Sequence, residues 1–335
     1  MDLSTTYMGL TLKNPLVPSA APVSETVDKI RQLEDAGAAA VVMFSIFEEQ
    51  VRQEAELLDQ RLTAGTESFA ESLSYFPAAE EYHVGPEEYL ETIRKAVKAV
   101  DIPIIGSLNG SSPQGWISYA RHIQEAGAKG LELNLYHIPT DPELTGADVE
   151  QQYLDVLSAV KSAVTIPVAL KLSPFFSSMA NMARSFDQAG ADALVLFNRF
   201  YQPDLDLENL VVSSTLNLSS PDEMRLPLRW VAILCGRIKA NLAATTGVHT
   251  VREVVKYLLA GADVVQTTSA LLKKGIRHLT TLVEDLDHWM EENEYESVRQ
   301  LKGVLSQRSV ADPTAFERAN YIKILEKYKN EYRME

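Results

Sequence analysis

The sequence lacks most of the features that tie a protein to an oxidising compartment, a metal cluster or a membrane. Its 335 residues include one cysteine, Cys235, so no disulfide can form within the chain and a centre held by several cysteines is excluded. No apolar run approaches the roughly 20 residues of a membrane span, and the first residues lack the charged and then apolar pattern of a secretion signal. The six histidines are scattered without the spacing of a metal site. We therefore expect a soluble, cytoplasmic protein without a bound metal.

Positive charge is also scarce. The chain has 31 lysines and arginines against 46 aspartates and glutamates, which gives a formal net charge of −15. Such a surface repels phosphate backbones and anionic lipid head groups, so nucleic acid and membrane surfaces are excluded as partners. The expected partner is a small molecule.

A repeated junction between helix and strand is the most informative pattern in the chain. Four helical runs end in an Ala-Gly-Ala step, around Gly37, Gly127, Gly190 and Gly261, and each passes directly into a short apolar run. Glycine in this place is the usual left-handed end of a helix. The apolar runs that follow are typical of parallel strands that are buried on both faces.

The full alternation predicts an α/β fold, a (β/α)8 TIM barrel. Eight strands separated by helices suit a closed parallel barrel, whereas an open doubly wound sheet is disfavoured because no G-x-G-x-x-G follows the first strand. The strands are expected at 16–19, 41–45, 104–108, 131–135, 168–172, 194–198, 242–246 and 264–268. Helical patterns between them include 25–36, 87–100, 114–126, 149–164 and 251–260.

Three stretches do not fit the alternation. Residues 48–85 and 199–228 form insertions after the second and sixth strands, on the face of a barrel that carries chemistry. Residues 284–335 predict a charged helical extension, which can pack on the barrel or form a subunit contact. We expect one domain over residues 1–335, with the barrel at about 3–283.

Polar side chains stand where the apolar strands end. Asn109, Asn134, Lys171 and Asn198 all belong to the rim that holds the sites of barrel enzymes. A single asparagine there is more often a turn residue, but the four together favour a polar ligand. A lysine at the end of an apolar strand needs an anionic partner, and a reduced flavin ring supplies one.

The last two strands end in small polar loops. Thr246-Gly247 permits close approach of the backbone to a ligand, and Thr268-Ser269 offers two hydroxyl groups. Barrels commonly bind phosphate at these two loops. The alternative is plain capping of the helices that follow.

These motifs together resemble the dihydroorotate dehydrogenase family over about residues 3–275. The opening LSTTYMGLTLKNPLVPSA, the strand ends ELNL, ALKLSP and LFN, and above all TTGVHTVREVVKYLLAGADVVQTTSALL carry the likeness. The resemblance implies a bound flavin mononucleotide (FMN), oxidoreductase chemistry on a CH–CH group in pyrimidine biosynthesis, and a homodimer of the soluble class. The implied cofactor-binding residues are Ser19, Ala20, Ala21, Ser45, Asn109, Asn134, Lys171, Asn198, Thr246, Gly247, Thr268 and Ser269.

The departures from the family pattern gather on the substrate side. The family motif N-x-S-(C/S)-P-N reads Asn134-Leu135-Tyr136-His137-Ile138-Pro139-Thr140 here, so His137 stands at the position of the catalytic base. Its pKa range suits acid–base work near neutrality, with Tyr136 as an alternative donor and a turn role for His137 as the other interpretation. The substrate is then dihydroorotate or a related dihydropyrimidine or enone.

Two other functions remain open. The chain can be a flavin subunit that passes electrons to a partner protein. It can also be a barrel without flavin that binds a phosphorylated metabolite, a lyase or isomerase with Lys171 as a Schiff-base residue. Arg199 and Arg225, in the second insertion, can clamp a substrate carboxylate or serve as surface arginines.

Overall fold

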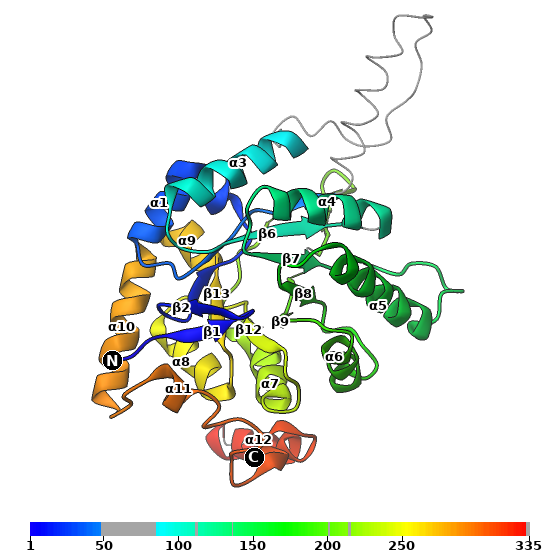
Figure 1. Ribbon diagram of the computed structural model, residues 1–335. Helices are drawn as coiled ribbons and strands as arrows, with labels where there is room; N and C mark the ends of the chain where they lie inside the picture. Colours follow the sequence, from blue (N-terminus) through cyan, green and yellow to red (C-terminus); the bar gives the residue numbers. More distant parts are fainter. Residues whose placement is uncertain (48–84, 111–112, 136, 200–201, 214–215, 333–335) are drawn as a thin grey trace, which may run out of the picture.

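The strands of the barrel form a nearly closed ring. The computed structural model (Figure 1) describes residues 1–47, 85–110, 113–135, 137–199, 202–213 and 216–332. All neighbours in the order β3-β13-β12-β9-β8-β7-β6-β4 are parallel, with β5 also paired to β6. The strands are β3 (Leu16–Pro18), β4 (Val41–Val42), β5 (Ile46–Phe47), β6 (Ile104–Asn109), β7 (Gly130–Asn134), β8 (Val168–Leu172), β9 (Ala193–Leu196), β12 (Asn241–Ala244) and β13 (Val264–Thr267). The amide of Ala39, just before β4, donates to the Leu16 carbonyl of β3 at 3.1 Å, which joins the two ends of the ring.

Helices cover the outside of the ring (Figure 1). They are α1 (Val27–Asp35), α3 (Pro86–Ala99), α4 (Pro113–Glu125), α5 (Gly146–Ala163), α6 (Met179–Gln188), α7 (Arg225–Leu234), α8 (Val251–Ala260), α9 (Ser269–Lys274), α10 (His278–Glu292), α11 (Val298–Leu301) and α12 (Ala319–Tyr332). The predicted barrel is confirmed, and its eight strands and five named helices lie within three residues of their expected bounds. The glycines of the four Ala-Gly-Ala steps have φ between 92° and 118°, as a left-handed helix end requires.

A short antiparallel hairpin closes the amino-terminal end of the barrel. It consists of β1 (Thr5–Tyr7) and β2 (Leu10–Leu12). The Met8 amide donates to Asn241 Oδ1, at the start of β12, at 2.8 Å, and Tyr7, Met8 and Leu12 pack inside the ring. The site must therefore lie at the opposite, carboxyl end of the strands.

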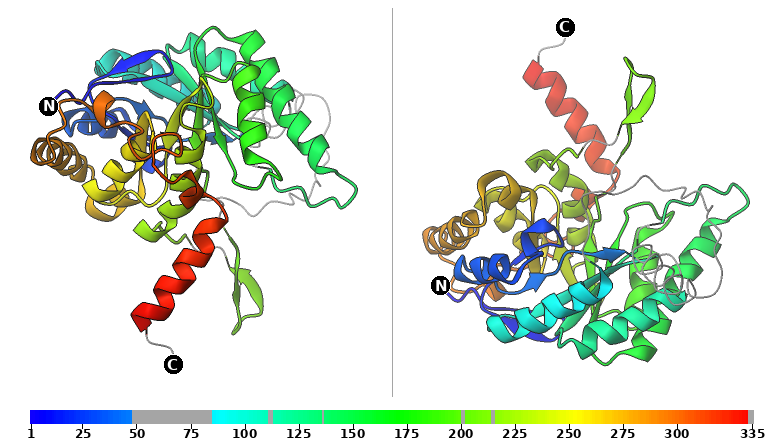
Figure 2. Two further views of the ribbon diagram at one scale, coloured as in Figure 1. Left: turned by 90° about the horizontal axis from the view of Figure 1, so that it is seen from below. Right: turned by 90° about the horizontal axis from the view of Figure 1, so that it is seen from above.

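A second hairpin and the last helix extend away from the barrel. The hairpin, β10 (Asp204–Asp206) and β11 (Val211–Ser213), belongs to the insertion after β9. Figure 2 shows that this hairpin and α12 project in the same direction from the same side of the molecule. The predicted start of the tail at residue 284 falls within α10, and most of the first insertion, residues 48–84, lies outside the described residues.

The part of the chain that the structure describes has neither a membrane-spanning helix nor a metal-binding cluster. None of the helices there is long and apolar enough to cross a lipid bilayer. The same residues contain no group of three or more histidine, cysteine, aspartate or glutamate side chains arranged to hold a metal ion.

Candidate active site

A cavity of about 560 Å³ opens at the carboxyl ends of the strands, within the size range of cofactor pockets. Nine of the twelve predicted cofactor-binding residues line it: Ser19, Ala20, Ala21, Lys171, Asn198, Thr246, Gly247, Thr268 and Ser269. Strand β8, the loops after β3, β9, β12 and β13, and the first residue of α9 supply these residues because the carboxyl ends of parallel strands meet at one rim. The wall also includes residues that the sequence did not single out, among them Phe47, Phe197, Ser219 and Gln266.

Lys171 presents a buried cation to this cavity. It is the fourth residue of β8 and is 8% exposed. Its Nζ donates to Ser19 Oγ at 3.1 Å and lies 3.4 Å from Glu132 Oε1. Since Glu132 is fully buried in β7, Lys171 bridges the interior of the barrel and the cavity.

Of the three predicted asparagines, one lines the cavity and two lie behind its wall. Asn198 lines the cavity, and its Nδ2 donates to Asn134 Oδ1 at 2.8 Å. Asn134 and Asn109 are buried and adjacent in the register of β7 and β6. Neither is part of the described cavity wall, and nor is Ser45, whose hydroxyl bonds the Ser107 hydroxyl at 2.8 Å. Asn134 therefore acts on the cavity by orienting the amide of Asn198.

The loop after β12 has a left-handed backbone and is closely packed. Thr246 and Gly247 have φ of +82° and +77°. A Cβ at Gly247 would stand 2.9 Å from Ser220 O and 3.0 Å from Met224 N. The buried hydroxyl of Tyr257, whose pKa burial raises, donates to Thr246 O at 2.8 Å. The loop is thus packed tightly between the second insertion and α8.

Ser219 brings the second insertion into this end of the cavity. Its hydroxyl lies 2.9 Å from Ser269 Oγ and accepts from the Gly247 amide at 3.4 Å. Its carbonyl accepts from His249 Nε2 at 2.7 Å and from Lys273 Nζ at 3.2 Å. Burial lowers the pKa of His249 below its ordinary value, so the imidazole is neutral at pH 7. Hydroxyl groups and one backbone amide from three separate loops therefore converge on one point.

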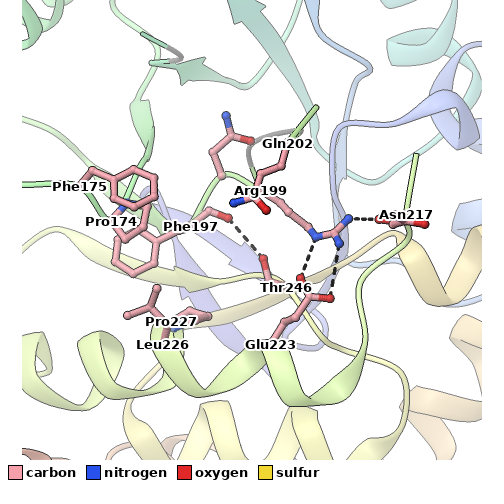
Figure 3. A pocket seen from close by; sticks show the side chains of 11 residues that line it. Pro174, Phe175, Phe197, Arg199, Gln202, Asn217, Glu223, Leu226, Pro227 and Thr246 are labelled. Carbon is pink, nitrogen blue, oxygen red and sulfur yellow. Dashed lines mark hydrogen bonds and ion pairs between the residues drawn. The ribbon is translucent and has the colours of Figure 1, made fainter. Parts of the chain in front are cut away.

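A second cavity of about 350 Å³ adjoins the first and shares Phe197, Asn198, Arg199 and Thr246 with it (Figure 3). Arg199 forms its polar end, where Nε donates to Glu223 Oε2 at 2.8 Å and a terminal nitrogen donates to the carbonyl of Asn217. Its charge is therefore matched within the chain, which disfavours the carboxylate clamp.

The other candidate arginine lies on the surface. Arg225 is exposed beside Asp222, with a closest nitrogen-to-oxygen distance of 3.7 Å. It is not part of either cavity wall as the structure describes them.

The proposed acid–base residues follow β7. His137 is exposed, two residues beyond buried Leu135, and it is not among the described residues of the cavity wall. Tyr136 lies outside the described residues.

Known proteins resemble this chain over nearly its whole length. The family model for dihydroorotate dehydrogenase matches residues 80–290. The catalytic subunit of dihydroorotate dehydrogenase B (NAD(+)) from Thermoplasma acidophilum is 28% identical over 316 residues, 90% of this chain and 98% of the relative. The same subunit from Pyrococcus abyssi is 26% identical over 310 residues, 90% of this chain and 98% of the relative. The NAD-dependent dihydropyrimidine dehydrogenase subunit PreA of Escherichia coli K12 is 24% identical over 325 residues, 92% of this chain and 78% of the relative. With the barrel in place and a family match that spans more than half of its residues, the chain belongs to the dihydroorotate dehydrogenase family of oxidoreductases.

Proposed function

We propose that the chain binds FMN in the larger cavity and dehydrogenates a CH–CH unit of dihydroorotate or a related dihydropyrimidine or enone in the cytoplasm. One observation carries this proposal. One cavity has the buried cation Lys171 on its wall. The same wall has, around Ser219, two hydroxyl groups and a backbone amide that lie close together. A flavin mononucleotide has matching parts, because it joins a ring that becomes anionic on reduction to a terminal phosphate.

The loops after β12 and β13 suit the phosphate. Ser219 and Ser269 present hydroxyl groups, and Gly247 presents a backbone amide without a side chain in the way. Such donors stabilise an anion where the backbone can approach it closely. His249 and Lys273 hold the Ser219 carbonyl and so fix the backbone segment that carries its hydroxyl.

The ring end is served by Lys171 and Asn198. When bound, the flavin supplies the hydride acceptor. A fixed ammonium group stabilises the negative charge that the ring gains. Because Asn198 Nδ2 donates to Asn134 Oδ1, the Asn198 carbonyl oxygen is left to accept from an imide N–H, as found in flavins and in pyrimidine diones.

His137 is proposed to take the second hydrogen of the substrate as a proton. The CH–CH unit loses a hydride from one carbon and a proton from the other, and the proton needs a base. A histidine side chain is the most common general base in enzymes and suits this step. Tyr136 is the alternative donor.

The visible absorption spectrum of the purified protein is the first test. We expect stoichiometric FMN, identified after denaturation, and bleaching of the bound flavin by dihydroorotate or dihydrouracil under anaerobic conditions. A colourless protein that takes up no added FMN would contradict the proposal. Borohydride trapping of a substrate on Lys171 would then favour a phosphate-binding lyase or isomerase.

A second candidate function is transfer of electrons to a partner subunit. The relatives are themselves named as subunits, which favours this alternative for part of the family. Copurification of a second protein that reoxidises the bound flavin would distinguish it from a self-sufficient enzyme.

We also propose that the chain forms a homodimer through the β10–β11 hairpin and α12. Leu207 and Leu210 of the hairpin segment are 80% and 86% exposed, and Tyr321, Ile324 and Leu325 of α12 are 44–66% exposed. An amphipathic helix and an isolated hairpin are both expected to have their apolar faces covered.

A second copy of the chain suits both elements at once. They project together from one side (Figure 2), so a twofold axis between them places the helix of each copy against the hairpin of the other. The charges are complementary, since the hairpin segment 202–213 carries three acidic and no basic residues whereas α12 carries three lysines and two glutamates.

Leu210→Asp should therefore weaken self-association at least about 100-fold, because it places a charge in an apolar contact. Sedimentation equilibrium at micromolar concentration measures this. Leu305→Asp is the control, since Leu305 is 50% exposed and lies outside both elements. A monomeric wild type, or a Leu210→Asp variant that remains dimeric, would contradict the proposed surface.

A further inference from the structure

The barrel interior contains a carboxylate that the proposed chemistry does not use. Glu132, in the middle of β7, is 1% exposed. Its Oε2 accepts from Gln266 Nε2 at 2.9 Å, and its Oε1 lies 3.4 Å from Lys171 Nζ. Among the described residues, Oε1 has no hydrogen-bond partner, and nor does Gln266 Oε1.

Stability alone does not account for this carboxylate. Desolvation of a buried ion pair costs about as much as the attraction between its charges returns, and apolar residues of similar volume are often equal or better. The surrounding interior positions include small residues such as Ala169, Ala193 and Ala243. Because alanine side chains are short, the interior of the ring has room for the long side chains of Glu132, Gln266 and Lys171.

Two of the three side chains face the cavity, and the third lies behind them inside the barrel. Lys171 and Gln266 both reach the cavity wall, whereas Glu132 is not among its described residues. The carboxylate thus meets the ammonium group from within the barrel, while the ammonium faces the cavity and Ser19. Any anion in the cavity competes with Glu132 for the charge of Lys171.

We infer that Glu132 is a positioning residue that sets how much of the charge of Lys171 acts on the cofactor, with Gln266 fixing the carboxylate. The inference rests on the proposed binding of FMN. Two electrons make the flavin ring anionic, so the reduced form gains more from Lys171 than the oxidised form does. Glu132 offsets part of that gain and keeps the reduced flavin from being stabilised too far to be reoxidised.

Glu132→Gln tests this with a readout that does not depend on turnover. The substitution keeps the shape and removes the charge, so the ratio of affinities for reduced over oxidised FMN should rise at least about tenfold. For a two-electron couple this is a rise in midpoint potential of about 30 mV, measured by anaerobic spectroscopic titration. Lys171→Met should lower the potential. The double variant Glu132→Gln/Lys171→Met should match Lys171→Met, because Glu132 acts through the lysine.

The possible outcomes separate the two proposals. A wild-type protein without FMN contradicts the proposed function itself. A wild type that binds FMN, combined with an unchanged potential in Glu132→Gln or with simple addition of the two shifts in the double variant, overturns the role of Glu132. If Glu132→Gln does not fold, Glu132→Asp, which lengthens the ion pair, should show a smaller rise in the same direction, and an unchanged potential there equally overturns it.

Discussion

Replacing Gly247 with alanine should lower the affinity for FMN at least about 100-fold, which corresponds to roughly 3 kcal/mol of binding free energy. The added Cβ would stand 2.9 Å from Ser220 O and 3.0 Å from Met224 N, and both are backbone atoms that cannot rotate away. The loop must therefore move from the segment that carries Ser219. The hydrogen bond from the Gly247 amide to Ser219 Oγ is then lost, together with the convergence that suits a phosphate.

Gly9→Ala is the matched control. Gly9 has φ of +74°, nearly the value of +77° at Gly247, but a Cβ there would meet no atom within 4 Å. It should therefore show only the backbone strain of a left-handed alanine, about 1–2 kcal/mol of unfolding free energy, with unchanged FMN affinity. Quenching of FMN fluorescence measures the affinity, and thermal unfolding measures the stability. Equal FMN affinities for the two variants would contradict the phosphate site.

Alanine at His137 should slow the reduction of bound flavin by substrate about 100- to 10,000-fold, the usual contribution of a positioned acid or base. FMN content should stay at the wild-type value, because His137 is exposed and is not among the described residues of the cavity wall. Stopped-flow measurement of flavin bleaching gives the rate directly.

His288→Ala is the control for this experiment, since His288 is an exposed histidine in α10. An unchanged rate in His137→Ala would end the catalytic role of this residue and leave it as a turn residue. Tyr136→Phe then becomes the informative variant, because a large loss of rate there would transfer the role to the neighbouring hydroxyl.

The barrel and most of its rim could be predicted because their signals are local. Each buried parallel strand is an apolar run that follows a glycine or a proline, and the end of a run marks the rim without knowledge of any distant contact. Lys171, Asn198, Thr246 and Ser269 were found in this way, and all four line the cavity.

The residues that were missed depend on contacts between distant parts of the chain. Glu132 is one polar residue in a buried strand, and only its partner Gln266, 134 positions away, shows that it faces inward. Ser219 lies 50 residues from Ser269 in an insertion without periodicity. The three-residue strands of the first hairpin are too short to give an alternating pattern. The sequence around Ser219, Ser220 and Pro221 is polar, but no local pattern predicts that it lies beside the loops after β12 and β13.

The hairpin that closes the barrel also sets a waiting time during synthesis. Its Met8 amide bonds Asn241, 233 residues later, and Thr5 bonds the carbonyl of Asp263, 258 residues later. At about 5–20 residues per second, a ribosome needs roughly 10 to 50 s to make that length of chain. Tyr7, Met8 and Leu12 leave the ribosome well before β12 and β13 are made, and they have no closed barrel to enter during this interval. The hairpin thus reaches its native place long after it is made, and its apolar side chains are exposed to aggregation until β12 and β13 follow.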